Sequence, residues 1–321
     1  MSTLFLAISF MVLASSYTAN KALLAHFPIH FLSSFKLCVA GSFFLLVVAR
    51  QKGLRSLVQK VQEDATLLVF ICIVSTAIPY YLKMYTLKHL NSSVAMLLGS
   101  LDPFITAFYS YFIFQEVLEK RKICGIACGF FSVFWLLRTS CSSGSAIVYE
   151  IYVWSIITAI AAIFIGRYGW ILTKKLLEAD RYSYAEINLV ILMGSGLAFL
   201  GVSCLCNRAF EVPYCNWDLF NRKNVALLLY TTVASNIYFY YVYSYFIKHY
   251  SITQVSYTGL IIPLSCHFLG WLFLGETLSA AFLFSFVMML GSYALYYYRH
   301  LKGVFSLFWV IARAPPSLED D

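Results

Sequence analysis

The chain has 321 residues, of which 61% are hydrophobic and 12% are charged, with a formal net charge of +8. A soluble domain of this size could not bury so much apolar side chain, because more than half of its surface would still face water. The composition therefore excludes a soluble globular protein and indicates a membrane protein with many spans.

Apolar runs of about 20 residues recur along the whole chain, and each is long enough to cross a bilayer as a helix. The longest polar stretches, near residues 50–64, 206–224 and after 299, are too short to fold as soluble domains. The predicted fold class is thus an all-α membrane protein embedded in the lipid bilayer. Its ten predicted transmembrane helices lie near residues 3–25, 29–49, 65–87, 92–114, 121–138, 148–173, 184–205, 225–247, 252–274 and 277–298.

The loops between these predicted helices differ in their content of Lys and Arg. If the N-terminus is cytoplasmic, the loops on that side hold fourteen Lys and Arg residues and the loops on the other side hold five. Membrane proteins carry their excess of basic residues in cytoplasmic loops. We therefore expect both termini to be cytoplasmic, and we attribute the net positive charge to topology and not to nucleic-acid binding.

The sequence repeats itself at an offset of 160 residues. Over 39 ungapped positions ten residues are identical, and an earlier pair of similar segments aligns Lys21 with Lys174. The identical pairs are Tyr80 and Tyr240, Tyr81 and Tyr241, Tyr85 and Tyr245, Lys88 and Lys248, His89 and His249, Gly99 and Gly259, Pro103 and Pro263, Phe108 and Phe268, Glu116 and Glu276, and Leu118 and Leu278. This pattern predicts two halves of five helices each.

An odd number of helices in each half decides how the halves are related. After five crossings the second half starts on the opposite side of the membrane, so the two halves are inverted relative to one another. Secondary transporters are built from such inverted repeats, which let a central site open to either side in turn. The expected domains are residues 1–140 as the first repeat, 141–300 as the second repeat and 301–321 as a cytoplasmic tail.

Each half closes with a Pro that is followed, thirteen residues later, by a Glu at the end of a span. This pattern resembles the EamA repeat of the drug/metabolite transporter superfamily, and the resemblance covers roughly residues 3–138 and 148–298. It implies a carrier of ten helices. Within the superfamily, the chain is similar in size and aromatic content to the S-adenosylmethionine transporters of intracellular bacteria, which implies a location in the bacterial inner membrane.

Ionisable residues inside a membrane are costly and usually serve a function. Four cations fall at membrane depth, and Asp102 is the one acid well inside a span. The cations are Lys21, Lys36, Lys83 and Arg167. This set suits a ligand that carries both signs of charge, with its carboxylate on Lys36 or Arg167. Two alternatives stay open, because Lys21 and Lys83 lie near enough to span ends to reach water, and Asp102 could simply pair with one of the cations.

Tyrosines crowd two corresponding spans. Tyr81, Tyr85, Tyr241 and Tyr245 form matched pairs four residues apart and are candidates to stack on a flat ring or to hold a cation. Other tyrosines in these spans are expected at the membrane interface.

Pro103, Pro263, Glu116 and Glu276 are predicted to act in gating and not in binding. Proline leaves a carbonyl of the preceding turn without its donor, so we expect a kink near Pro103. The two glutamates would lie at helix junctions, close to the N-terminal dipole of the following helix.

The predicted function is a secondary transporter, an antiporter working by alternating access on a small zwitterionic or mixed-charge metabolite, with S-adenosylmethionine as the best single substrate. The alternatives are an exporter of amino acids or drugs, a carrier of an anionic metabolite such as a sugar phosphate or nucleotide sugar, and a channel. The chain has no nucleophile–base pair, phosphate loop or metal motif, so we expect no enzyme activity, cofactor, metal or nucleic-acid partner. A homodimer stays open.

Overall fold

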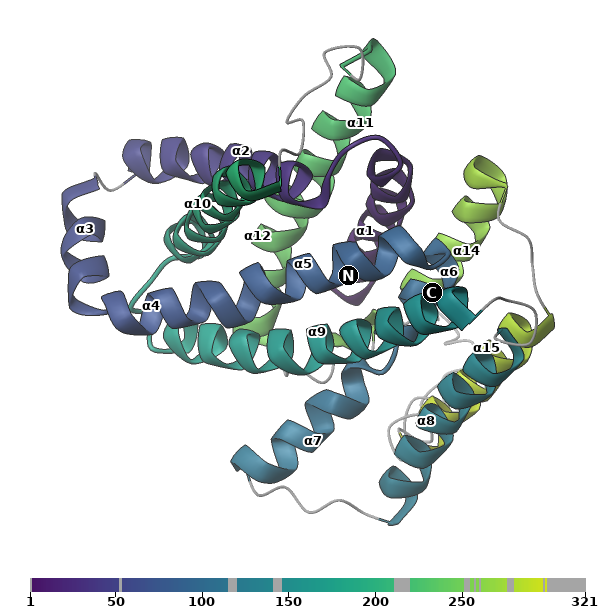
Figure 1. The fold of residues 1–321 in the computed structure, drawn as a ribbon. Helices are drawn as coiled ribbons and strands as arrows, with labels where there is room; N and C mark the ends of the chain where they lie inside the picture. Colours follow the sequence, from purple (N-terminus) through teal and green to yellow (C-terminus); the bar gives the residue numbers. More distant parts are fainter. Residues whose placement is uncertain are drawn as a thin grey trace, which may run out of the picture. The chain divides into compact units, whose positions relative to one another are not determined.

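The computed structural model describes residues 2–51, 54–114, 120–140, 146–210, 220–250, 255–256, 258–259, 261–275, 280–296 and 298. These residues form helices and short connections with no strand among them, which confirms the all-α prediction (Figure 1). The chain divides into two compact units, residues 1–110 with 143–278, and residues 111–142 with 279–321.

The first unit contains most of the helices, and α7 runs from it into the second unit at residue 111. Its elements are α1 (Ser2–Leu24), α2 (Ile29–Gln51), α3 (Leu54–Glu63), α4 (Ala65–Ile71), η1 (Cys72–Ala77), α5 (Ile78–His89), α6 (Ser92–Gly99), α7 (Asp102–Phe114), α9 (Ala146–Glu178), α10 (Tyr184–Phe210), α11 (Arg222–Thr231), η3 (Thr232–Tyr238), α12 (Phe239–His249) and α14 (Ile261–Leu274). The second unit contains α8 (Lys120–Ser140) packed against α15 (Ala280–Tyr296). There the Ser292 hydroxyl donates to the Gly125 carbonyl at 2.5 Å.

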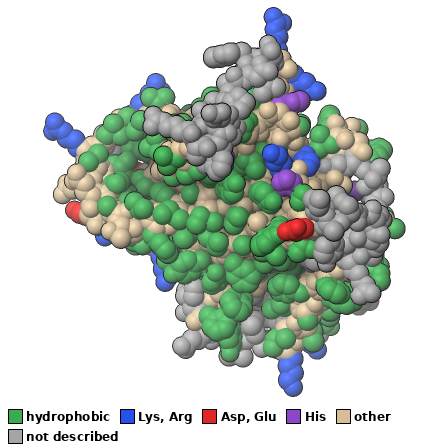
Figure 2. Space-filling view, in the orientation of Figure 1, with side chains coloured by type: hydrophobic (Ala, Val, Ile, Leu, Met, Phe, Trp, Pro, Cys, Tyr) green, Lys and Arg blue, Asp and Glu red, His purple; other side chains and the backbone are tan. Residues whose placement is uncertain are grey.

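Five helices in the described part of the chain are long and apolar enough to cross a membrane. They are Ile29–Gln51, Ala65–His89, Glu150–Glu178, Tyr184–Leu205 and Arg222–His249, and all coincide with predicted spans. Four further apolar helices are shorter, at Val94–Thr106, Ile123–Ser132, Ile261–Leu274 and Ala280–Ser292. Large apolar side chains cover much of the visible face in Figure 2, as expected of a surface in contact with lipid.

The third helix of each predicted half contains a π-helical segment in its middle. η1 joins α4 to α5, and η3 joins α11 to α12. Their first residues, Cys72 and Thr232, are 160 positions apart, the offset of the sequence repeat. After each segment the helix continues to a Lys-His pair and ends at a residue with extended backbone, Leu90 or Tyr250. The repeat in sequence is therefore matched by a repeat in local structure.

The fourth predicted span is broken next to Pro103. α6 ends at Gly99, Ser100 and Leu101 form a turn, and α7 begins at Asp102. Proline cannot donate to the preceding turn, so the break falls where its missing N–H would have been needed. The kink that the sequence predicts near Pro103 is therefore confirmed as an interruption between two helices. A turn at Gly259 precedes α14 in the corresponding region.

Small residues allow neighbouring helices of the first unit to approach closely. α2 and α10 pack along much of their length. A Cβ atom on Gly196 of α10 would lie 2.8 Å from the backbone nitrogen of Cys38 in α2. A Cβ atom on Gly169 of α9 would lie 2.4 Å from the backbone of Ser75 in η1. Without solvent exclusion to drive them together, membrane helices depend on such close contact, so these two glycines fix how α10 and α9 pack.

Candidate substrate site

Two of the predicted site residues form an ion pair inside the first unit. Asp102 is the first residue of α7, and Arg167 lies within α9. The Arg167 Nε donates to Asp102 Oδ1 at 2.9 Å, and its Nη2 donates to Asp102 Oδ2. Arg167 Nη1 also donates to the Tyr243 hydroxyl at 2.7 Å. Arg167 is 7% exposed and Asp102 is 25% exposed, so the pair is accessible from its acidic side.

Lys83 of α5 lies close enough to Arg167 for their two charges to repel. Its side chain is exposed. Within the described residues, no carboxylate comes within ion-pair distance of Lys83. Since Asp102 neutralises only Arg167, the region around Lys83 keeps a positive charge that an anionic group of a ligand can offset.

Lys36 of α2 is fully buried, at 0% exposure. Its Nζ donates to the Asn20 Oδ1 of α1 at 2.7 Å, and Asn20 is itself only 1% exposed. An amide oxygen satisfies one donor but does not neutralise a charge. Lys36 is therefore a second buried cation whose described partner is uncharged.

A cluster of aromatic side chains lies beside the ion pair. Tyr17 of α1 and Tyr80 of α5 both interact with Tyr240 of α12. The Trp170 ring of α9 lies 5.6 Å from the Tyr240 ring and 4.7 Å from the Tyr243 ring, between centroids. Tyr243 bonds Arg167, so the ring cluster and the ion pair are connected through one buried side chain.

The structure gives Lys21 a different set of partners from the other three cations. Its Nζ donates to three backbone carbonyls at the end of α5 and beyond it. The acceptors are the carbonyl oxygens of Leu87, Lys88 and Leu90, at 2.8, 3.0 and 2.7 Å. Lys174, its partner in the sequence repeat, donates to the Tyr250 carbonyl after α12 at 3.0 Å. Both lysines thus cap the C-terminal ends of corresponding helices.

The two predicted tyrosines of α5 contact histidines. The Tyr81 ring stacks on His30 with a centroid distance of 5.1 Å and on Phe199 with 6.3 Å. The Tyr85 ring is 4.5 Å from the ring of His89, at the end of its own helix. These contacts place Tyr81 and Tyr85 toward α2, α10 and the helix end.

The two predicted tyrosines of α12 lie on its exposed side, each 45% exposed. Both contact the Tyr184 ring edge-on, Tyr241 at 5.9 Å and Tyr245 at 5.8 Å. Sequence reasoning missed the tyrosines next to the ion pair, Tyr240 and Tyr243. The repeat did contain a signal, because Tyr240 is one of the ten identical residues and directly precedes Tyr241.

The residues predicted to act in gating are described in part. Pro103 lies buried in the first turn of α7, and Pro263 lies buried near the start of α14. Glu116 and Glu276 lie outside the described residues, so their gating role stays a prediction.

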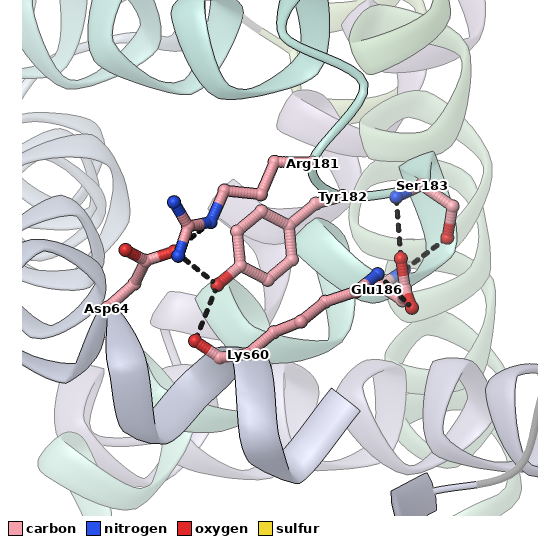
Figure 3. A network of polar contacts seen from close by, with 6 residues as sticks. All are labelled: Lys60, Asp64, Arg181, Tyr182, Ser183 and Glu186. Carbon is pink, nitrogen blue, oxygen red and sulfur yellow. Dashed lines mark hydrogen bonds and ion pairs between the residues drawn. The ribbon is translucent and has the colours of Figure 1, made fainter. Parts of the chain in front are cut away.

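A second polar network joins the α3–α4 junction to the connection between α9 and α10 (Figure 3). Arg181 Nε pairs with Asp64 Oδ2 at 2.6 Å, and Tyr182 donates to the same carboxylate at 2.8 Å. The Tyr182 hydroxyl also lies 3.0 Å from the Lys60 carbonyl. Burial, followed by the hydrogen bond with Asp64, raises the pKa of Tyr182 to about 12. Tyr182 therefore remains protonated and able to donate.

The same network extends into the first turn of α10. Ser183 N donates to Glu186 Oε2 at 2.7 Å, and Glu186 N donates to Ser183 Oγ at 3.3 Å, which is a capping box. Lys60 pairs with Glu186 at 3.3 Å. Lys248 of α12 pairs with Asp180, and its hydrogen bond lowers the pKa of the Asp180 carboxyl. These contacts tie segments from both predicted halves together at one end of the first unit.

Comparison with known proteins gives consistent results along the chain. Residues 1–138 and 153–298 match the EamA-like transporter family. Two curated relatives, from Chlamydia trachomatis serovar L2 and serovar D, are named S-adenosylmethionine/S-adenosylhomocysteine transporter and are each 27% identical over 90% of this chain and 87% of their own length. A relative with the same name from Chlamydia muridarum is 26% identical over 90% of both chains.

A solved crystal structure has the same fold with a TM-score of 0.64, at 16% identity over 92% of this chain and 96% of its own. Apolar helices and a match in both halves of the sequence agree on an integral membrane protein. The chain belongs to the EamA-like transporter family, and it is a transporter and not an enzyme.

Proposed function

We propose that the protein is a secondary transporter for S-adenosylmethionine, which it moves across a bacterial inner membrane by alternating access in exchange for S-adenosylhomocysteine. The observation that carries this proposal is the mixed-charge site formed by Asp102, Arg167 and Lys83 next to aromatic rings. S-adenosylmethionine has a carboxylate, an ammonium, a sulfonium and a purine ring. The names of three relatives that align over 90% of the chain support the choice of substrate.

Two of the three charged groups of this ligand, the carboxylate and the sulfonium, have a suitable position. The carboxylate is assigned to Lys83 and Arg167, with buried Lys36 as a further attractive charge, because a fixed cation in a low-dielectric interior attracts an anion much more strongly than in water. The sulfonium is assigned to the accessible side of Asp102 and to the face of a tyrosine. Tyr81, Tyr85, Tyr241 and Tyr245 remain secondary candidates, on surfaces that the ligand could contact as it enters or leaves.

The proposed architecture is ten transmembrane helices arranged as two inverted repeats, residues 1–140 and 141–300, followed by a cytoplasmic tail at 301–321, with both termini cytoplasmic. The equal spacing of η1 and η3 and the family match in each half support this arrangement. Inverted repeats provide two equivalent halves that can exchange conformations around one site.

Counterflow in proteoliposomes tests the function. Vesicles loaded with unlabelled S-adenosylhomocysteine should take up labelled S-adenosylmethionine faster than empty vesicles. The reason is that the substrate site of an antiporter returns to the outer side only with a substrate bound, which the loaded vesicles supply. Vesicles without protein and vesicles loaded with methionine or a sugar phosphate are the controls. Equal uptake into loaded and empty vesicles would indicate a channel, and uptake only against a sugar phosphate would favour the second candidate, an anion carrier, which the excess of cations over Asp102 also suits.

A further inference from the structure

The two π-helical segments meet through a pair of reciprocal contacts. The Thr76 hydroxyl of η1 lies 3.5 Å from the Tyr240 hydroxyl, which follows η3. In return, the Asn236 side chain of η3 interacts with Tyr80, which follows η1. Thr76 corresponds to Asn236, and Tyr80 to Tyr240, at the 160-residue offset. The same contact is therefore made twice, once in each direction, as at a local twofold axis.

Asn236 retains unused hydrogen-bonding capacity at this point. Its side chain is 0% exposed, and its Oδ1 accepts from the Ser235 hydroxyl at 2.7 Å. The Asn236 amide lies within reach of the Tyr80 hydroxyl, and among the described residues neither the Asn236 Nδ2 nor the Tyr80 hydroxyl has any other hydrogen-bond partner. Buried polar groups almost always use their hydrogen-bonding capacity, so the second donor of the Asn236 amide and the remaining capacity of the Tyr80 hydroxyl require a partner. A ligand that bonds both groups would supply it.

Aromatic rings lie close to these two groups. Tyr17, Tyr80 and Tyr240 are each half-buried. Trp170 contacts Tyr240 at 5.6 Å with an angle of 54° between the rings. The half-buried aromatic side chains are able to stack on a flat group, and the hydroxyl and amide groups are uncharged donors and acceptors. This chemistry fits a flat, neutral, nitrogen-rich ring and not a phosphate or a carboxylate.

We propose that Asn236, Tyr80 and Tyr240 form a subsite for a purine base with an exocyclic amino group, of which adenine is the type. An amide presents a donor and an acceptor side by side, which matches the adjacent amino group and ring nitrogen of adenine. The inference rests on the proposed function, since the base would belong to the same ligand whose carboxylate meets Lys83. Lys83 lies three residues after Tyr80 on α5, so both ends of the ligand contact one helix face.

A measurement of nucleoside binding tests the subsite independently of the transport function. Adenosine, inosine and S-adenosylhomocysteine are titrated into the purified protein, and the melting temperature and the tryptophan fluorescence are followed. The parent protein should bind adenosine at least tenfold more tightly than inosine, which has a carbonyl in place of the amino group. Asn236→Leu should remove most of this preference and lower the affinity for S-adenosylhomocysteine at least tenfold. Tyr80→Phe should lower the affinity for both adenosine and S-adenosylhomocysteine by a smaller factor.

Matched variants exclude a general loss of structure. Tyr109→Phe removes a hydroxyl that already donates to the Phe164 carbonyl at 3.0 Å, so it should leave the preference for adenosine unchanged. If Asn236→Leu does not fold, Asn236→Thr introduces the side chain found at the corresponding position 76 and serves as its replacement. Adenosine binding by a parent that does not transport S-adenosylmethionine would overturn the proposed function alone. No adenosine binding by the parent, or an unchanged preference in both the Asn236 and Tyr80 variants, would overturn the subsite.

Discussion

At the scale of single residues, the charges of the site are divided unequally. The bidentate pair of Asp102 with Arg167 leaves that part of the site close to neutral, whereas Lys83 and Lys36 have no carboxylate partner among the described residues. Removing one member of a buried ion pair costs more than the pair contributes, because the other charge is left uncompensated. Asp102 therefore holds Arg167 in position, and under the proposed function its accessible side meets a cation of the ligand.

Asp102→Asn should distinguish a ligand with a sulfonium from one without it. S-adenosylmethionine carries a positive sulfur and S-adenosylhomocysteine a neutral one, so the variant should bind the first at least tenfold more weakly, about 1.4 kcal/mol, and the second with a smaller loss. Competition for binding to the purified protein measures both. Glu150→Gln removes an exposed carboxylate from the same helix as Arg167 and should change neither. Undiminished S-adenosylmethionine binding by Asp102→Asn would remove Asp102 from the site, and a gain in affinity for a sugar phosphate would support an anion carrier.

At the scale of helices, corresponding elements end in the same way. α5 and α12 each follow a π-helical segment, and a lysine from another helix caps each C-terminal end. Helix termini leave backbone carbonyls without partners, which is costly in a membrane unless a side chain supplies a donor. This gives Lys21 a structural explanation. The sequence left open whether Lys21 contacts a ligand or reaches water at a span end, and it gave no sign of the capping contact.

Lys21→Met tests which explanation applies. If Lys21 caps α5, the variant should lower the melting temperature by several degrees, because three carbonyls lose a charged donor, while the affinity for substrate stays within about twofold. Lys88→Met replaces an exposed lysine at the same helix end and should leave the melting temperature and the affinity for substrate unchanged. A tenfold loss of affinity at unchanged melting temperature would show instead that Lys21 binds the substrate.

The polar network of Figure 3 allows a test of pH dependence. The pKa of Tyr182 rises from 10.0 to about 12 on folding, so its contribution to stability is complete below pH 10 and is lost as pH rises through 12. Tyr182→Phe should cost about 1 kcal/mol at neutral pH through the lost hydrogen bonds. The difference in melting temperature between parent and variant should shrink between pH 10 and 12. A difference that stays constant over this range would contradict the assigned hydrogen bond to Asp64.

At the scale of the whole molecule, composition was enough to predict the helical class, the resemblance of the Pro–Glu pattern to the EamA repeat indicated the family, and the missing N–H of Pro103 predicted the break next to it. Asp102 and Arg167 were found from the cost of charge in a membrane, and their pairing was one of two alternatives. The tyrosines could not be ranked from sequence. Choosing among Tyr80, Tyr81, Tyr240 and Tyr241 requires the orientation of the helix, and no sequence rule places the π-helical segments that set it. Nor could the sequence show that Lys36 bonds Asn20, since that contact depends on how α1 packs against α2.

Accessibility of introduced cysteines tests the proposed inversion. Ser56 lies exposed in α3 and Glu150 lies exposed near the start of α9. With an impermeant maleimide on intact cells, Glu150→Cys should react at once, and Ser56→Cys should react only after permeabilisation. The labelling of the parent protein, with its nine native cysteines, is subtracted as background. Reaction of both positions from one side of the membrane would contradict the inverted arrangement.

The π-helical segments also determine which residues the following helices turn inward. A π turn takes up about one residue more than an α turn, so every side chain after it is rotated by about 100° from its place on an uninterrupted helical wheel. Tyr80 and Lys83 after η1, and Tyr240 and Tyr243 after η3, owe their direction to this rotation. On a helical wheel that treats Ala65–His89 as one regular α-helix, a different set of side chains faces the interior. Each π-helical segment therefore lets the residues before it and the residues after it turn different stripes of the sequence toward the interior of the unit.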